Sequence, residues 1–296
     1  MGTGFSIRDV GSSVLPLASL AVERLKYSHM YTTMGILGIL IAARGGKLPV
    51  VHILPVISIT ITTTGLYMLN DVFDLEIDRV SHPERALPRG TVGVRQTTFT
   101  ALLLMALGTI LAFSFSVTSG ILVALIMVFG VLYSAPPVRL RRFPIVPSAI
   151  IGFFVFLSFL AGISFREATL TGKLAFGAFL LWAMFLCAST AKDLADVQGD
   201  KVDRVRSLPL ILGFERAFKV TSVVVCTGFV FPVLFLLLFG LNVGFLTLIL
   251  LFLFVEVYCL RKMYQTRFAP EMHLWWERGF GPFVGVQLTL MVAALF

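Results

Sequence analysis

The amino-acid sequence predicts an all-α protein, a multi-pass bundle of about nine transmembrane helices. Its 296 residues are 57% hydrophobic and only 14% charged, and the mean hydropathy is +0.94, which excludes an ordinary soluble domain. Apolar runs long enough to cross a bilayer recur along the whole chain. None of them alternates between polar and apolar residues as a barrel strand would. Because backbone polar groups in lipid need internal partners, helices are the expected solution.

The apolar runs define the predicted spans by their length. In chain order they lie at 27–43, 48–70, 97–115, 118–134, 144–164, 174–192, 219–239, 243–260 and 280–296. We expect them to form a single membrane domain covering residues 1–296. The segment 1–22 is mildly amphipathic and is expected to lie on the membrane surface, and it lacks the pattern of a signal peptide. The three cysteines lie inside apolar runs and are predicted to pack as free thiols.

Basic residues gather in alternate connecting segments. The rich segments are 79–96, 135–143, 193–218 and 261–279. The basic residues of the poorer segments are Arg44, Lys47, Arg166 and Lys173. The positive-inside rule therefore places the rich segments and the N-terminus in the cytoplasm, so 79–96 and 193–218 are predicted cytoplasmic cap loops. This topology, together with anionic ligands, explains the net charge of +8 without nucleic acid.

The second apolar run ends in an acidic segment. On a helix, Asn70, Asp74 and Asp78 form one stripe, and Asp71 lies beside it. Carboxylates at membrane depth are costly and usually mark function. Like charges at this spacing repel unless cations lie between them, and hard oxygen ligands are those that Mg2+ prefers. The segment therefore predicts a Mg2+ site.

A second acidic segment ends the sixth run. Its residues Asp193, Asp196 and Asp200 follow Asp71, Asp74 and Asp78 at a constant shift of 122. Each segment is followed by a basic loop that contains Leu-Pro. The predicted topology places both on the cytoplasmic side, so we expect them to face one another across a cavity and to hold about two or three Mg2+ ions.

Such an array suits a diphosphate, whose charge metals and basic side chains neutralise together. The candidate diphosphate-binding residues lie in or beside the basic loops: Arg85, Arg139, Lys192, Lys201 and Arg206. The surrounding apolar helices are suited to a long hydrocarbon tail. A diphosphate head at the interface and a tail in the membrane describe a polyprenyl diphosphate.

The two motifs resemble the signatures of the UbiA superfamily of intramembrane prenyltransferases. Asn70-Asp71-x-x-Asp74-x-x-x-Asp78 is similar to the first signature, and Asp193-x-x-Asp196-x-x-x-Asp200 is similar to the second. The resemblance implies a nine-helix fold, Mg2+ dependence and transfer of a prenyl group from its diphosphate to an acceptor. The residues that match the metal-binding positions are Asn70, Asp74, Asp78, Asp196 and Asp200. Ala86 departs from the family pattern, because many members have proline there.

Several other residues are candidates with two open interpretations. Asp71 or Asp193 either takes the proton of the acceptor or binds metal through water. Tyr133 is either an interfacial aromatic residue or a group near the reacting carbon. The residues at the start of the first run are either interface anchors or part of the acceptor pocket: Arg24, Lys26 and His29.

The acceptor is the least determined part of the prediction. The motifs are most similar to the branch of the family that acts on isoprenoid lipids, such as geranylgeranylglyceryl phosphate. The alternative is an aromatic acceptor of quinone biosynthesis, 4-hydroxybenzoate or dihydroxynaphthoate. A cation-coupled transporter is the alternative from another class, but its acidic residues would lie near the bilayer midplane. Expected partners are the diphosphate donor, the acceptor and the bilayer, with no nucleic acid and no obligate protein partner.

Overall fold

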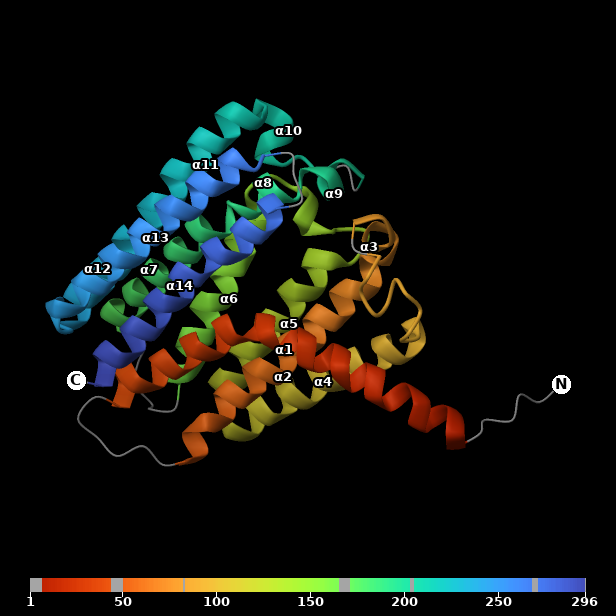
Figure 1. The fold of residues 1–296 in the computed structure, drawn as a ribbon. Coiled ribbons are helices and arrows are strands. Elements are labelled where there is room, and N and C mark those ends of the chain that lie inside the picture. Colours follow the sequence, from red (N-terminus) through yellow and green to blue (C-terminus); the bar gives the residue numbers. More distant parts are fainter. Residues whose placement is uncertain are drawn as a thin grey trace.

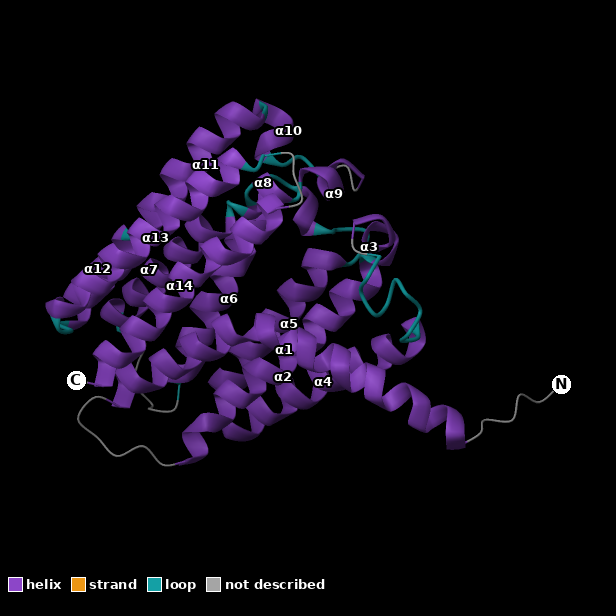
Figure 2. Cartoon of the chain, in the orientation of Figure 1, coloured by secondary structure: helices purple, strands orange, loops and turns teal. Residues whose placement is uncertain are grey.

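In the part of the chain that the computed structural model describes, every secondary-structure element is a helix, and turns and loops connect the helices (Figures 1 and 2). The described residues are 7–43, 50–81, 83–164, 171–202, 205–267 and 271–295. Within them, eight helical segments are long and apolar enough to cross a membrane. The predicted all-α, multi-pass membrane fold is therefore confirmed.

Each of the eight segments corresponds to a predicted span. Four are single helices: α4 (Val94–Phe115), α5 (Val117–Ser134), α6 (Val146–Ile163) and α14 (Glu271–Leu295). Four combine two elements: η1 and α2 (Val50–Ile53, Leu54–Phe73), α7 and α8 (Gly172–Ser189, Lys192–Ala195), α11 and α12 (Phe214–Gly228, Val230–Phe239), and η3 and α13 (Val243–Phe245, Leu246–Gln265).

The first predicted span, 27–43, is the second half of the long helix α1 (Ile7–Ala43) and is not one of the eight. This half carries polar residues that bond to α2. Ser28 Oγ lies 3.1 Å from Thr64 Oγ1, and Thr32 Oγ1 lies 2.7 Å from Thr60 Oγ1. The helix packs against α2, α6 and α14, so it belongs to the bundle although it is less apolar than the eight.

Glycines allow α1 and α6 to approach closely. A Cβ atom on Gly38 would lie 2.2 Å from the carbonyl oxygen of Phe159, and one on Gly162 would lie 2.0 Å from that of Gly35. Neither distance is possible for a real side chain. Small residues at helix contacts are a usual feature of membrane bundles, where backbones pack directly against each other.

The predicted cap loops contain short helices. The segment 79–96 holds the end of α3 (Leu75–Ser81) and the start of α4, and 193–218 holds α9 (Val197–Val202) and α10 (Leu208–Leu212). All three cysteines are free and at least partly buried, as predicted. Some residues behind the orientation and surface predictions lie outside the described residues: Arg44, Lys47, Arg166, Arg204 and residues 1–6.

Candidate active site

The first acidic segment bends at Asp74. α2 ends at Phe73, Asp74 takes φ −96° and ψ 1°, and α3 begins at Leu75. The backbone N–H of Asp74 still donates to the carbonyl of Asn70 at 2.9 Å, and that of Asp78 donates to the carbonyl of Asp74 at 2.8 Å. The acidic segment, predicted as the end of one helix, is therefore two helices joined at Asp74.

The second acidic segment bends in the same way at Asp196. This residue takes φ −92° and ψ 10° between α8 and α9. Its N–H donates to the carbonyl of Lys192 at 3.1 Å, and the N–H of Asp200 donates to the carbonyl of Asp196 at 2.9 Å. Asp196 is the equivalent of Asp74 at the shift of 122, so the sequence repeat extends to the backbone conformation.

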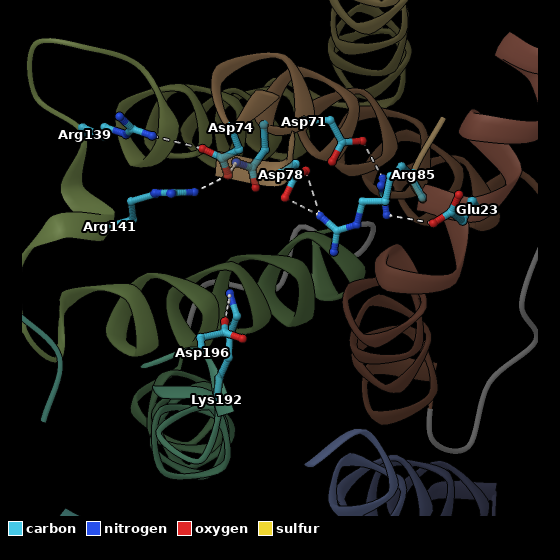
Figure 3. A network of polar contacts seen from close by, with 11 residues as sticks. Glu23, Asp71, Asp74, Asp78, Arg85, Arg139, Arg141, Lys192 and Asp196 are labelled. Atoms are coloured by element: carbon cyan, nitrogen blue, oxygen red, sulfur yellow. Dashed lines mark hydrogen bonds and ion pairs between the residues drawn. The ribbon is translucent and has the colours of Figure 1, made fainter. Parts of the chain in front are cut away.

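The fold brings the two bent ends together. α3 and α9 are in contact, and Figure 3 shows Lys192 and Asp196 on the opposite side of the network from Asp74 and Asp78. Arg141 connects the two sides, because it is bonded to Asp74 and also interacts electrostatically with Asp200. The two acidic segments therefore belong to one site.

Asp74 is the most heavily bonded carboxylate of the first segment. Arg139 Nη2 donates to its Oδ1 at 3.2 Å, and Arg141 Nη1 and Asn70 Nδ2 both donate to its Oδ2 (Figure 3). Burial raises the pKa of the Asp74 carboxyl above its ordinary value, and the guanidinium groups of Arg141 and Arg139 counteract part of that rise. The η2 turn (Leu140–Arg142) thus brings cations to the bend between α2 and α3.

The other two carboxylates of this segment are paired with single arginines. Asp78 is buried and accepts two hydrogen bonds from Arg85 Nη1, at 2.9 Å to Oδ1 and 2.8 Å to Oδ2. Asp71 accepts a bond of 2.5 Å from Arg24 Nε. Arg24 is buried and also contacts Glu23 Oε1 at 3.2 Å. Burial of the charged Arg24 side chain costs desolvation free energy, and its contacts with the carboxylates of Asp71 and Glu23 offset part of that cost.

The second segment is less fully paired. Lys192 Nζ lies 3.5 Å from Asp196 Oδ2, and Asp193 interacts electrostatically with Asp200 and Lys192. Asp200 Oδ2 is buried and has no hydrogen-bond partner among the described residues. Burial raises the pKa of the Asp200 carboxyl above its ordinary value, and an interaction with the Ser207 side chain counteracts part of that rise. An unsatisfied carboxylate oxygen at this place is an available ligand for a cation.

The donor set fits a hard divalent cation, although the ligands are not gathered around one point. Within the described residues, no three acidic, histidine or cysteine side chains are close enough together to hold a metal ion. The carboxylates are instead neutralised by arginines and a lysine. The oxygen-only set and the unpartnered Asp200 Oδ2 nevertheless match what Mg2+ requires.

Tyr133 lies near the second acidic end. It is half-buried at the end of α5 and interacts electrostatically with Lys192. It also interacts with Tyr31 and Tyr67, whose hydroxyl oxygens are 3.2 Å apart. A role for Tyr133 near the reacting carbon stays a prediction.

The remaining candidates lie further out. Lys201 and Arg206 are exposed, and their predicted contact with diphosphate stays a prediction. Lys26 is exposed, and the His29 ring nitrogen Nδ1 is in hydrogen-bond contact with the carbonyl of Lys26. The residue that sequence reasoning missed is Arg141. The sequence did contain a signal for Arg141, because it lies in the same basic loop as Arg139.

Comparison with known proteins shows the family of the chain. The model of the UbiA prenyltransferase family matches residues 30–276, which is most of the chain. The chain belongs to the UbiA prenyltransferase family. It is therefore an intramembrane prenyltransferase, and the transporter alternative is excluded. The predicted family resemblance is confirmed.

Individual UbiA relatives are moderately similar. A digeranylgeranylglyceryl phosphate synthase of Pyrococcus furiosus is 31% identical over 193 residues, which cover 64% of this chain and 67% of the relative. The one from Ignicoccus hospitalis is 29% identical over 240 residues, 78% of each chain. A UbiA homologue from Archaeoglobus fulgidus bound to GPP and Mg2+ has the same fold, with a TM-score of 0.67 at 16% identity over 93% of this chain and 99% of that one.

Proposed function

We propose that this UbiA protein transfers a geranylgeranyl group from geranylgeranyl diphosphate to geranylgeranylglyceryl phosphate. The observation that carries the reaction type is the pair of bent acidic ends, α2–α3 and α8–α9, in one site lined with arginines. The observation that favours the lipid acceptor is the name shared by the relatives, digeranylgeranylglyceryl phosphate synthase.

In the proposed reaction, the free hydroxyl oxygen of the acceptor forms a bond to C1 of the prenyl group. The bond between C1 and the diphosphate oxygen breaks, and the diphosphate leaves with the electron pair. The hydroxyl proton goes to a base, for which Asp71 and Asp193 are the candidates. The apolar bundle excludes water, which would otherwise compete for C1.

In this proposal, basic side chains of the site neutralise part of the charge of the diphosphate. Arg139 and Arg141 converge on Asp74, and Arg85 on Asp78. We propose that these arginines, with Lys192, Lys201 and Arg206, bind the diphosphate oxygens. Guanidinium groups match phosphate geometry and strengthen their contacts as negative charge develops on the leaving group.

The proposed cofactor is Mg2+. Its ligands would be Asn70, Asp74, Asp78, Asp196 and Asp200. When bound, it supplies Lewis-acid stabilisation of the departing diphosphate. Support comes from the chemistry of this donor set and from the A. fulgidus homologue of the same fold, which binds GPP and Mg2+. We further propose that the site faces the cytoplasm, as the distribution of basic loops predicts.

The test is a transfer assay with purified protein in lipid vesicles. Geranylgeranyl diphosphate is supplied with geranylgeranylglyceryl phosphate, 4-hydroxybenzoate or dihydroxynaphthoate, each with Mg2+ or with a chelator. The proposal expects prenylated product and diphosphate release only with the glyceryl phosphate lipid and Mg2+. Prenylation of only an aromatic acceptor would overturn the proposed lipid acceptor. Undiminished transfer in the presence of the chelator would overturn the proposed Mg2+ dependence.

A further inference from the structure

A polar cavity lies next to the first acidic segment, on the side of α1. It has a volume of about 470 Å³ and is formed by three elements: α1, the turn at 84–91 and the start of α14. The charged residues of its lining are three cations, Lys26, Arg85 and Arg89, and three carboxylates, Glu23, Glu84 and Glu277.

Two side chains connect the cavity to the acidic site. Arg85 lines the cavity and donates both of its bonds to Asp78 through one nitrogen, Nη1. Nε and Nη2 of the same guanidinium therefore remain outside that pair. Glu23 also lines the cavity, and it contacts Arg24, which holds Asp71 (Figure 3). A group bound in the cavity would thus be one side chain away from the first acidic segment.

The lining has the chemistry of a phosphorylated polyol site. Lys26, Arg85 and Arg89 supply three permanent positive charges, and Glu23, Glu84 and Glu277 supply three carboxylates as acceptors for hydroxyl groups. Cations bind phosphate oxygens with charge-assisted hydrogen bonds, and carboxylates accept bonds from hydroxyls. A hydrocarbon tail would leave these groups unpaired, which is costly.

We propose that this cavity holds the glyceryl phosphate headgroup of the acceptor, with Lys26 and Arg89 contacting its phosphate. This inference rests on the proposed function, because it assigns a place to the acceptor of that reaction. Arg85 then contacts the acceptor side of the site as well as Asp78. The headgroup is held against the turn at 84–91, and its free hydroxyl is directed towards the acidic segments.

The kinetic test compares charge removal inside and outside the cavity. Lys26→Ala and Arg89→Ala each remove one proposed phosphate contact, and Arg95→Ala removes an exposed arginine a few residues along the chain that does not line the cavity. We expect the KM for geranylgeranylglyceryl phosphate to rise roughly 10- to 100-fold in the two cavity variants, as loss of a charge-assisted bond predicts. The KM for geranylgeranyl diphosphate is expected to stay within about twofold, as in Arg95→Ala.

A second variant tests the space rather than the charge. Ala86 lines the cavity, and Ala86→Phe would fill part of it while every charge remains. We expect the same selective rise in acceptor KM. Each variant is first checked for a monodisperse peak after extraction in detergent. If wild-type protein transfers to the lipid acceptor and all three cavity variants match Arg95→Ala, the cavity assignment is wrong and the proposed function stands.

A binding measurement separates the cavity from the reaction. Glycerol 1-phosphate and inorganic phosphate are titrated into wild type, Arg89→Ala and Arg95→Ala by isothermal titration calorimetry. The inference expects glycerol 1-phosphate to bind wild type and Arg95→Ala more tightly than inorganic phosphate does, and to bind Arg89→Ala about tenfold more weakly. Equal binding by all three proteins would overturn it. If wild type transfers to no glyceryl phosphate lipid, the proposed function fails, and the titration still decides whether the cavity recognises this headgroup.

Discussion

At the scale of single residues, the site is a set of acidic groups, four of which are paired with a cation. Asp74 forms ion pairs with two arginines, Asp78 and Asp71 each form one with an arginine, and Asp196 forms one with a lysine. The carboxylate positions follow from the sequence, because their spacing repeats. The cations that pair with these carboxylates cannot be predicted from the sequence, since they come from distant segments that only the fold brings close. Arg141 is the clearest case, because a basic loop alone does not indicate which arginine turns inward.

The role of Arg141 gives a residue-scale prediction. Arg141→Lys keeps the charge beside Asp74 but loses the planar fork that matches phosphate. We expect catalytic efficiency for the diphosphate donor to fall roughly 10- to 100-fold, with little change in the KM of the acceptor. Steady-state kinetics with each substrate varied in turn provides the measurement. Arg216→Lys, an exposed arginine of α11, is the matched control, and equal behaviour of the two variants would remove Arg141 from the site.

At the scale of elements, two features could not be predicted from sequence. The helix periodicity of 70–78 indicates a continuous helix, yet the chain bends at Asp74 and again at the equivalent Asp196. The first bend has no proline or glycine within a turn, the usual sequence signals of a break, whereas Gly199 lies three residues after the second. The close approach of α1 and α6 could not be predicted from the sequence either, because glycines occur in most of the apolar runs and do not single out this helix pair. In both cases tertiary packing, rather than local preference, decides the geometry.

The contact of α1 with α6 gives the element-scale prediction. Gly162→Ala would place a Cβ 2.0 Å from the carbonyl oxygen of Gly35, so the two helices must move apart. We expect a loss of about 1–3 kcal/mol of stability from this overpacking. Gly281→Ala is the same change in a spanning helix where nothing lies within 4 Å of the added atom. Thermal unfolding in detergent should show a lower Tm for Gly162→Ala only, and equal values would contradict the packing described.

At the scale of the whole molecule, composition and run length were sufficient for the fold class. Eight of the nine predicted spans are the eight apolar helical segments of the described chain, and the ninth is half of α1. The length of α1 was not predicted, because the charged residues Glu23, Arg24 and Lys26 separate the N-terminal segment from the apolar run 27–43. The orientation in the membrane comes from the basic loops alone and stays a prediction.

Membrane topology is testable by labelling single cysteines introduced into a variant that lacks the three natural ones. Cysteine in place of Arg95 or Arg261, both exposed at the predicted cytoplasmic ends, should react only with reagent on that side. Cysteine in place of Thr118 or Asn242, also exposed, should react only from the opposite side. Reaction of Arg95→Cys and Thr118→Cys from the same side would refute the arrangement.

The central claim is that the two bent acidic ends form one site for diphosphate release. Its most direct test is the rate of prenyl transfer, at saturating Mg2+, by Asp74→Asn and Asp196→Asn in vesicles. Glu76→Gln is the control, because Glu76 is an exposed carboxylate of α3 that pairs only with Arg79 in the described contacts. We expect each aspartate variant to lose at least about 100-fold in kcat, whereas Glu76→Gln keeps near-normal activity. Near-normal transfer by either aspartate variant would contradict a shared site.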